Sequence, residues 1–596
     1  MSYLDLDNAQ IIKDIGAIRE DTRQELLSIL TSFENGTCLI LDNDFLLPLG
    51  LLVDKSELKE LGVGKVFVFQ DQDPKITQKN ILFFIRPKKE VIEKVANYIK
   101  LNETNDTFSK KEFHIYFVPH KSFLCEKILE KQGVRGAVTI NEFHFDLLNL
   151  DEDVFTLFLE SSFQDYLSGD TTSLYFISSA INKLQGFFGM IPTVKYIGKN
   201  AKIVTDMLVR MGKDTHLDPS VQPKIHNLVV VDRMIDLITP MMIQLTYEGI
   251  IDELYEITNS YAEFEPKIIG KEGTKKEKYI LNSNDVLFEE LRDLNIGFVG
   301  EFLKQKARYI AEQYDQRHNL QEIRDISNFV HKLPGLQKEH FSLSIHLNIL
   351  EDIFNKTQKT QKFQKYVNNQ LGLVFEGNPV NEYVEEMMYT DESLVDVLRL
   401  LCLQSMVNND FKGKVFDNFR KDIIQNYGFK HIFTLEKLAK LGMFQKRQTK
   451  GKGKMNFVQM KKILNLIDPN FDENKGISSV YSGYTPITAR LIQKSIKSDG
   501  WKEIEEVLKQ LTDGVYGEIA QQNAKSQNAP SENVVVQSDK KMVCFVFFVG
   551  GVTYSEISAL RLLSQMEDSK YDFVVGTTQM INGKSLIESC FENYID

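Results

Sequence analysis

Cysteine is scarce in this sequence: 596 residues contain five, at Cys38, Cys125, Cys402, Cys544 and Cys590. They lie far apart, none belongs to a Cys-x-x-Cys pair, and none has a histidine nearby at metal-ligand spacing. This pattern argues against a disulfide framework and against a structural zinc site. Most of the cysteines lie in apolar segments, so we expect buried thiols in a reducing compartment.

Long apolar runs and excess positive charge are also missing. The longest apolar run, Met542–Val552, falls far short of the roughly 20 residues that cross a bilayer. The first residues, MSYLDLDNAQ, lack the basic and apolar regions of a secretory signal. A formal net charge of −12 argues against a general nucleic-acid binder, which needs a basic face. We expect a soluble, cytoplasmic protein that binds no nucleic acid and meets membranes only through partners.

Motifs for catalysis or cofactor binding are absent. The sequence has no Gly-x-Ser-x-Gly elbow and no plausible Cys/His nucleophile pair. Asn582–Ser585 resembles the end of a phosphate-binding loop, but Thr578 stands where that loop needs glycine. The two glycines after Val549 either admit a phosphate or form a tight turn with Thr553 or Ser555 capping a helix. We favour the turn, because no third glycine follows at dinucleotide-binding spacing, and we expect no catalytic residue, no cofactor and no metal.

Two carboxylates near Arg233 leave two interpretations open. Asp232 and Asp236 follow an apolar run and suit a metal or acid/base pair. Arg233 beside them suits a structural ion pair equally well. No histidine, glutamate or third carboxylate completes a site in this stretch, so it gives no positive evidence for catalysis.

The first 135 residues alternate short apolar runs with helical segments. The runs are Cys38–Asp42, Val66–Phe69, Ile81–Ile85 and Phe113–Val118, and the helical segments are Lys55–Leu61, Val91–Ile99 and Phe123–Lys131. Continuous apolar runs between amphipathic helices are typical of parallel strands that are buried on both faces. We predict a doubly wound α/β domain over residues 1–135.

A second α/β domain is predicted to be split in sequence. Leu228–Val231 is a clear buried strand, and after Thr239-Pro240 almost every periodic segment is helical until about Ile477. Strands return only at Val543–Val549 and Phe573–Val575. Two strands are too few for a stable parallel sheet, so we expect them to join the sheet of Leu228–Val231. The predicted domains are therefore 136–245 with 478–596, and a helical third domain at 246–477.

Two apolar stripes mark the helical region, at Ile323, Ile326, Val330 and Leu333 and at Leu343, Leu347, Leu350 and Phe354. Leu333-Pro334-Gly335 lies between them, and proline both lacks an N–H and disfavours helix before it. We predict two helices joined by a stiff turn or hinge. The stripes either pack on each other or offer a surface to a partner helix, and spacing alone does not decide.

Val229–Tyr255 reads VVVDRMIDLITPMMIQLTYEGIIDELY and closely resembles the signature of the Sec/Munc (SM) proteins, which govern SNARE-mediated membrane fusion. Five further segments are similar to the vacuolar members of that family: Asn80–Pro87, Phe113–Pro119, Gly169–Tyr175, Tyr481–Pro486 and Phe547–Thr553. The resemblance runs essentially from end to end. It implies an arch-shaped SM fold, with two doubly wound parallel-sheet domains and a large helical insertion in the second.

The resemblance also implies where partners bind. In the family, the proline-bearing hairpin of the third domain holds SNARE helices, which here corresponds to residues 246–365 and to Lys332, Pro334, Gln337, Leu343, His346 and Leu347. Vacuolar members are held in the HOPS and CORVET tethering complexes by the C-terminal helical region of vacuolar protein sorting-associated protein 16. The matching segment, Arg420–Ile432 within residues 366–477, places Arg420, Phe429 and Ile432 at that contact. Phe429 stands where a tyrosine is usual and keeps the aromatic surface without the hydroxyl.

The expected function is therefore the regulation of SNARE assembly during tethering and fusion at the late endosome, lysosome or vacuole. Partners implied by the resemblance are SNARE proteins and other HOPS or CORVET subunits. Two alternatives remain: a nucleotide- or sugar-phosphate-binding α/β enzyme, and a scaffold subunit that binds its tethering partner but no SNARE.

Overall fold

A computed structural model describes residues 11, 14–33, 36–42, 45–69, 76–105, 111–214, 221–315, 323–358, 361–447, 456–469, 476–497, 499–521 and 541–591. Residues 10–159 form one compact unit, and a second unit contains residues 160–596. Within the described ranges, no helix combines the length and apolar character needed to span a membrane.

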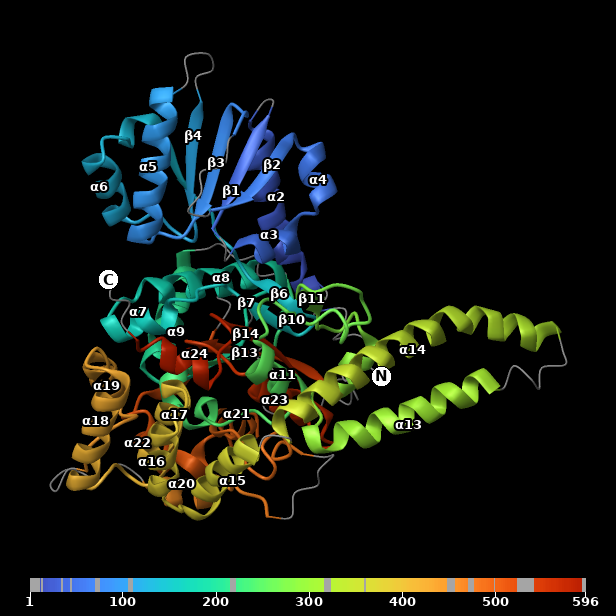
Figure 1. The fold of residues 1–596 in the computed structure, drawn as a ribbon, viewed down its shortest axis with the longest axis vertical. Helices are drawn as coiled ribbons and strands as arrows, with labels where there is room; N and C mark the ends of the chain where they lie inside the picture. The colour runs from blue at the N-terminus through green and yellow to red at the C-terminus, as the bar shows by residue number, and fades with distance from the viewer. Residues whose placement is uncertain are drawn as a thin grey trace. The chain divides into compact units, whose positions relative to one another are not determined.

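The first unit is built on a five-stranded sheet with the order β2-β1-β3-β4-β5, and every neighbouring pair of strands is parallel. Figure 1 shows this sheet with its helices (blue to cyan). The elements are α2 (Ala17–Thr31), β1 (Thr37–Leu41), α3 (Leu46–Leu52), α4 (Lys55–Glu60), β2 (Val63–Val68), β3 (Asn80–Ile85), α5 (Lys89–Asn105), β4 (Glu112–Phe117), α6 (Phe123–Lys131), the short 3₁₀ helix η2 (Arg135–Ala137) and β5 (Val138–Glu142). An antiparallel pair, β6 (Leu148–Asp151) and β7 (Val154–Thr156), follows.

Burial explains why these strands are apolar throughout. In β3, Ile81, Phe83 and Ile85 join a core with α5 and α6, while the alternate residues Leu82 and Phe84 are buried on the opposite face. The predicted doubly wound sheet is confirmed. Its fifth strand β5 pairs with β4, so the sheet extends beyond the boundary that we expected at residue 135.

The second unit contains another sheet, whose strands from this unit follow the order β12-β8-β9-β13-β14. Its elements before the helical insertion are α7 (Ser162–Ser168), α8 (Thr172–Phe188), β8 (Thr193–Ile197), α9 (Lys199–Asp214), β9 (Asn227–Asp232) and η3 (Arg233–Ile235). Those after it are α21 (Ile487–Ser495), η5 (Lys502–Ile504), α22 (Glu505–Leu511), β12 (Tyr516–Ala520), β13 (Met542–Val549), α23 (Tyr554–Gln565), β14 (Tyr571–Thr577) and α24 (Gly583–Glu588).

Strands from the two ends of this unit meet in the sheet. β13 lies between β9 and β14 and is parallel to both, with Val546 opposite Val229 and Val575. The prediction that the late strands join the sheet of Leu228–Val231 is therefore confirmed. The edge strand β12 was not predicted, and it pairs antiparallel with β8.

The chain between these strands is almost entirely helical. The helices are α10 (Ile238–Met241), α11 (Tyr247–Tyr255), α12 (Val286–Leu291), α13 (Ile296–Asp315), α14 (Ile323–Thr357), α15 (Gln361–Glu376), α16 (Asn381–Tyr389), α17 (Leu394–Val407), α18 (Gly413–Tyr427), α19 (His431–Lys440) and α20 (Phe457–Ile463). One antiparallel pair, β10 (Tyr261–Phe264) with β11 (Glu277–Ile280), departs from the all-helical expectation.

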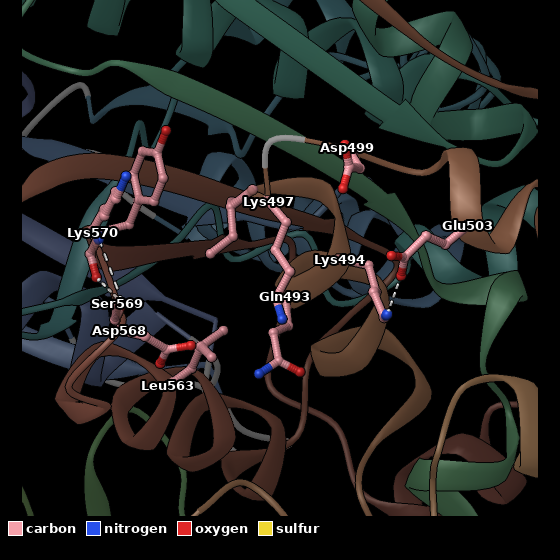
Figure 2. A pocket seen from close by; sticks show the side chains of 12 residues that line it. Gln493, Lys494, Lys497, Asp499, Glu503, Leu563, Asp568, Ser569 and Lys570 are labelled. Carbon is pink, nitrogen blue, oxygen red and sulfur yellow. Dashed lines mark hydrogen bonds and ion pairs between the residues drawn. The ribbon is translucent and has the colours of Figure 1, made fainter. Parts of the chain in front are cut away.

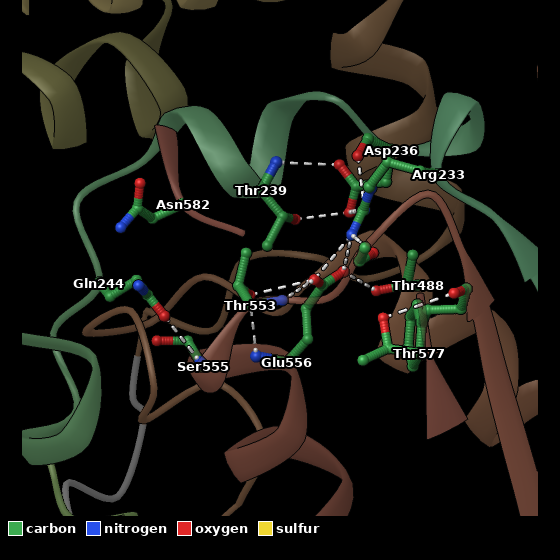
Figure 3. Close-up of polar contacts among 12 residues, drawn as sticks. Arg233, Asp236, Thr239, Gln244, Thr488, Thr553, Ser555, Glu556, Thr577 and Asn582 are labelled. Atoms are coloured by element: carbon green, nitrogen blue, oxygen red, sulfur yellow. Dashed lines mark hydrogen bonds and ion pairs between the residues drawn. The ribbon is translucent and has the colours of Figure 1, made fainter. Parts of the chain in front are cut away.

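A buried ion pair joins the two ends of the split sheet (Figure 3). Arg233, directly after β9, donates from Nη1 to Glu556 Oε2 at 2.7 Å, and both side chains are fully buried. Glu556 also accepts hydrogen bonds from the hydroxyls of Thr488 at 2.5 Å and of Thr553 at 3.0 Å. Glu556 thus holds three segments together: the residues after β9, helix α21 and the residues after β13.

Helix α11 provides the second joint, because its side chains bond to several distant segments. The Tyr247 hydroxyl lies 2.9 Å from His346 Nδ1 on α14, and Glu253 pairs with Arg399 on α17 at 2.7 Å. Asp252 accepts a 2.8 Å hydrogen bond from Asn582, the N-cap of α24, and burial raises the pKa of this carboxyl to about 7. Helices of the insertion and the C-terminal segment therefore share α11 as their attachment.

We expect Glu556→Gln to destabilise the protein by about 3–5 kcal/mol, because it leaves the buried Arg233 guanidinium without its main counter-charge. Thermal and urea unfolding measure the change. Glu301→Gln is the matched control: its ion pair with Lys304, at 3.4 Å, is more than half exposed, so the expected loss is under about 1 kcal/mol. Equal losses for the two variants would contradict a special role for the Arg233–Glu556 pair.

Candidate partner-binding surfaces

Helix α14 is continuous from Ile323 to Thr357, with Pro334 inside it. Our prediction of two helices joined by a turn at Leu333-Pro334-Gly335 is therefore wrong. The hairpin is formed instead by α13 and α14, which run side by side and extend away from the other helices of the second unit (Figure 1). Pro334 removes the N–H that would bond to the Val330 carbonyl, but both residues are exposed, so water can satisfy that carbonyl.

The side chains predicted to hold SNARE helices divide into two groups. Four of them are exposed on α14: Lys332, Pro334, Gln337 and Leu347. Leu343 is only 5% exposed and His346 is fully buried, so neither presents its side chain at the surface. At 3.6 residues per turn, Lys332 and Pro334 also lie on roughly opposite sides of the helix. The structure thus brings Pro334 and Gln337 together on one face and takes Leu343 and His346 out of the surface.

Among the described residues of the hairpin, Phe341 is the most exposed apolar one, and no sequence pattern pointed to it. Phe341, with 60% of its surface exposed, lies four residues beyond Gln337 on the same face. Val330, Leu347 and Phe354 are further exposed apolar residues of α14. At 3.6 residues per turn, Val330 shares the face of Phe341, whereas Leu347 and Phe354 lie about a third of a turn away. Large exposed apolar side chains on a projecting helix are typical of a surface that binds another helix. Of the first predicted stripe, the side chains of Ile323 and Ile326 lie outside the described residues.

His346 belongs to a buried cluster at the base of the hairpin. Its Nε2 lies 3.0 Å from Asp285 Oδ2, and its ring stacks on Phe288 at 5.9 Å between centroids. Asp285 also accepts hydrogen bonds from Ser342 at 2.6 Å and Tyr279 at 2.9 Å. Burial alone would raise the pKa of Asp285, but its bonds to His346 and Ser342 hold that pKa well below its usual range. The cluster fixes α14 to α11, α12 and β11.

The second predicted surface lies where α18 turns into α19. Gly428, with φ +105°, ends α18, and the turn leaves Phe429 with 72% of its surface exposed. Arg420 on α18 is exposed, Ile432 on α19 is half-buried, and Phe433 beside it is a further exposed aromatic residue. The three predicted residues therefore belong to two adjoining helices and the turn between them. A side chain as apolar as Phe429 at such exposure indicates a contact surface rather than a core position.

At the carboxyl ends of β9 and β13, where open α/β sheets usually bind ligands, the protein's own side chains fill the space. A Cβ on Gly550 would lie 3.0 Å from Arg233 Cβ, and one on Gly551 would lie 2.5 Å from Ile581 Cγ2. Thr553 caps α23 and forms a capping box with Glu556, which confirms the predicted turn. The glycines are thus needed for close packing, and Glu556, far away in sequence, is the third carboxylate that the sequence analysis did not find near Asp232 and Asp236.

A small pocket of about 270 Å³ lies at the opposite, amino-terminal side of β14 (Figure 2). Its lining includes three lysines and three carboxylates: Lys494, Lys497, Lys570, Asp499, Glu503 and Asp568. Lys494 pairs with Glu503 at 2.6 Å. Because the charges balance and the pocket is away from the ligand-binding edge of the sheet, it gives no support to a nucleotide site.

Comparisons with known proteins agree with this architecture. The model of the Sec1 family matches residues 37–589. Vacuolar protein sorting-associated protein 33A of Rattus norvegicus is 38% identical over 97% of this chain and 98% of its own length. The vacuolar protein-sorting-associated protein 33 homolog of Arabidopsis thaliana is 35% identical, with 98% of each chain covered.

A solved structure, the SM protein Vps45 in complex with the Qa SNARE Tlg2, has a similar fold. Its TM-score is 0.54 at 16% identity, covering 96% of this chain and 97% of that chain. The resemblance to SM proteins and the predicted α/β fold with a helical insertion are therefore confirmed. Because the family match spans nearly the whole sequence, the chain belongs to the Sec1 family, whose members are the SM proteins.

Proposed function

We propose that this chain regulates SNARE assembly during vacuolar, late endosomal or lysosomal fusion, as the SM-type subunit of a HOPS- or CORVET-like tethering complex. Its two relatives named above are vacuolar protein sorting-associated proteins, and the similar Vps45 structure contains a Qa SNARE. The observation that carries the proposal is the pair of exposed apolar side chains on one face of α14, Val330 and above all Phe341. The protein acts by binding, without a catalytic step, and reaches membranes through its complex.

The hairpin supplies the chemistry that a SNARE helix needs. SNARE motifs are amphipathic helices, and an apolar stripe is buried best against another apolar surface. Phe341 and Val330 provide that surface on one face of α14, and Gln337 offers an amide beside Phe341. Holding two SNARE motifs in register lowers the entropic cost of starting a four-helix bundle, provided that the surface favours this arrangement over others.

The surface around Phe429 is proposed to bind the C-terminal helical region of vacuolar protein sorting-associated protein 16. Phe429 contributes exposed aromatic area, Arg420 contributes charge, and Ile432 contributes an apolar edge. Aromatic and arginine side chains are enriched among the residues that dominate binding energy at interfaces. The two surfaces lie on different helices, so they can be tested independently.

Phe341→Asp is expected to weaken binding of a Qa SNARE-motif peptide at least tenfold. Burying a phenylalanine side chain contributes about 1.5–3 kcal/mol, and a charge in its place opposes burial. Fluorescence anisotropy with the labelled peptide measures the affinity. Phe429→Asp is the control in this assay and should leave it unchanged. Full affinity of the Phe341→Asp variant would contradict the assignment of α14.

Phe429→Asp should abolish capture of the C-terminal region of vacuolar protein sorting-associated protein 16, because a carboxylate replaces the central aromatic contact. Co-purification and calorimetry measure the loss, with Phe341→Asp now serving as the control. The melting temperature should not change, since Phe429 is exposed. If the Phe429→Asp variant still captures this partner, Phe429 does not belong to the interface. If the unmodified protein captures this partner but no SNARE, the result favours a scaffold subunit.

His346→Leu tests the buried cluster. Tyr247 and Asp285 would each lose a hydrogen-bond partner, so we expect a loss of about 2–3 kcal/mol in stability. Amide hydrogen exchange should become faster along α14 and stay unchanged in the first unit's sheet. Unaltered stability with weaker peptide binding would instead return His346 to the contact surface.

A further inference from the structure

The exposed face of α14 that carries Phe341 has a regular spacing. Five exposed positions follow one another at alternating steps of four and three residues: Val330, Pro334, Gln337, Phe341 and Ser344. Alternating steps of four and three residues make a seven-residue repeat, which is the spacing of a coiled-coil seam. We call these five positions the seam of α14.

The seam is not the face that α14 uses inside the protein. Leu336 and Leu343 are buried, and at 3.6 residues per turn they lie on roughly the opposite side of the helix from Phe341. The next position of the repeat is Asn348, whose side chain donates a 3.0 Å hydrogen bond to the carbonyl of Ile268. The seam therefore ends before Asn348, and its five positions extend over about 21 Å of exposed helix.

Apolar side chains stand on both sides of one amide in the seam. Val330 and Pro334 precede Gln337, and Phe341 follows it, with Val330 56% and Phe341 60% exposed. Among the described residues, no group bonds to the amide of Gln337. Its donors and its acceptor are therefore available to a partner that covers the seam.

The spacing and the amide together favour an amphipathic helix as the occupant. A helix with its own seven-residue repeat places a side chain against each seam position, whereas an extended strand matches alternate residues. A bilayer would leave the amide of Gln337 without hydrogen-bond partners between two apolar side chains. The SNARE motif proposed above is an amphipathic helix and meets both requirements.

We propose that Gln337 fixes the register in which a SNARE helix lies along α14, by bonding to one hydrogen-bonding side chain in the apolar seam of that helix. This role rests on the proposed function of α14. A shift of the bound helix by seven residues would preserve apolar contacts with Val330 and Phe341, but it would bury the amide against an apolar side chain. A buried amide without a partner is costly, and single polar positions set the register of coiled coils for this reason.

Disulfide trapping measures the register directly, because the five native cysteines of the chain are all buried. Ser344→Cys places one exposed thiol on the seam of the full-length chain. A set of Qa SNARE-motif peptides carries single cysteines at steps of seven residues. In a glutathione buffer, we expect one peptide position to be captured about fivefold more than the positions seven residues away on either side. With Gln337→Leu added, that preference should fall below about twofold.

Gln305→Leu is the matched control, because it removes another exposed amide from the same hairpin. Gln305 lies on the side of α13 that faces away from the buried Leu303 and Ile310, so its loss should leave the trapping preference unchanged. Leucine in place of each polar seam residue of the peptide completes the cycle. One such change should abolish the preference, and combining it with Gln337→Leu should have no further effect.

A preference that survives Gln337→Leu overturns the role of Gln337, and so does equal capture at all peptide positions by the chain that retains this glutamine. A preference that is lost equally in Gln305→Leu overturns it as well. Phe341→Asp separates this role from the proposed function. If Phe341→Asp weakens peptide binding while Gln337→Leu leaves the register unchanged, α14 binds the helix without selecting its register. If Phe341→Asp leaves binding intact, the assignment of α14 to SNARE binding is itself wrong.

Discussion

The buried contact between Arg233 and Glu556 is the constraint on which the second unit depends. The two residues are 323 positions apart in the chain. Arg233 directly follows β9, and Glu556 lies in the first turn of α23, which follows β13. Bringing them together requires β9 and β13 to pair in register. The whole helical insertion must then leave the sheet after β9 and return to it before β13. A buried guanidinium without a carboxylate is costly, so the pair strongly disfavours any arrangement in which the two halves of the sheet are separated.

The same joint explains why the stretch Val229–Tyr255 identifies the family without being a binding site. Its first part is β9 and Arg233, and its last part is α11, whose Tyr247, Asp252 and Glu253 bond to α14, α24 and α17 respectively. Nearly every polar residue here is buried and bonded inside the protein. The carboxyl edge of the sheet is filled by these contacts, and both surfaces that we propose for partners lie instead on helices of the insertion.

Sequence patterns predicted the sheets well, because strands buried on both faces must be apolar at every position, as in β3 and β13. They predicted the two halves of the split domain for the same reason. They failed at Pro334, where exposure lets water replace the missing hydrogen bond. The resemblance placed His346 on the binding surface, but the fold buries it between Tyr247 and Asp285, which are far from it in sequence. Phe341 was missed because one exposed phenylalanine has no periodic signal. The family resemblance alone assigned a binding role to Arg420, Phe429 and Ile432. Nothing in the spacing of these residues distinguishes a surface turn from a core position.

Both proposed surfaces are positioned by one helix of nine residues. α14 reaches α11 through His346 and Tyr247, while α17, which packs close to α16 and α24, reaches it through Arg399 and Glu253. Both attachments are buried polar contacts with short hydrogen bonds, which hold side chains in fixed orientations more strictly than apolar packing does. The hairpin that offers Phe341 and the helices that lead to Phe429 therefore have a defined spacing. If the chain presents a SNARE helix while a tethering partner holds it, as we propose, it needs such spacing more than it needs flexibility, and α11 provides it.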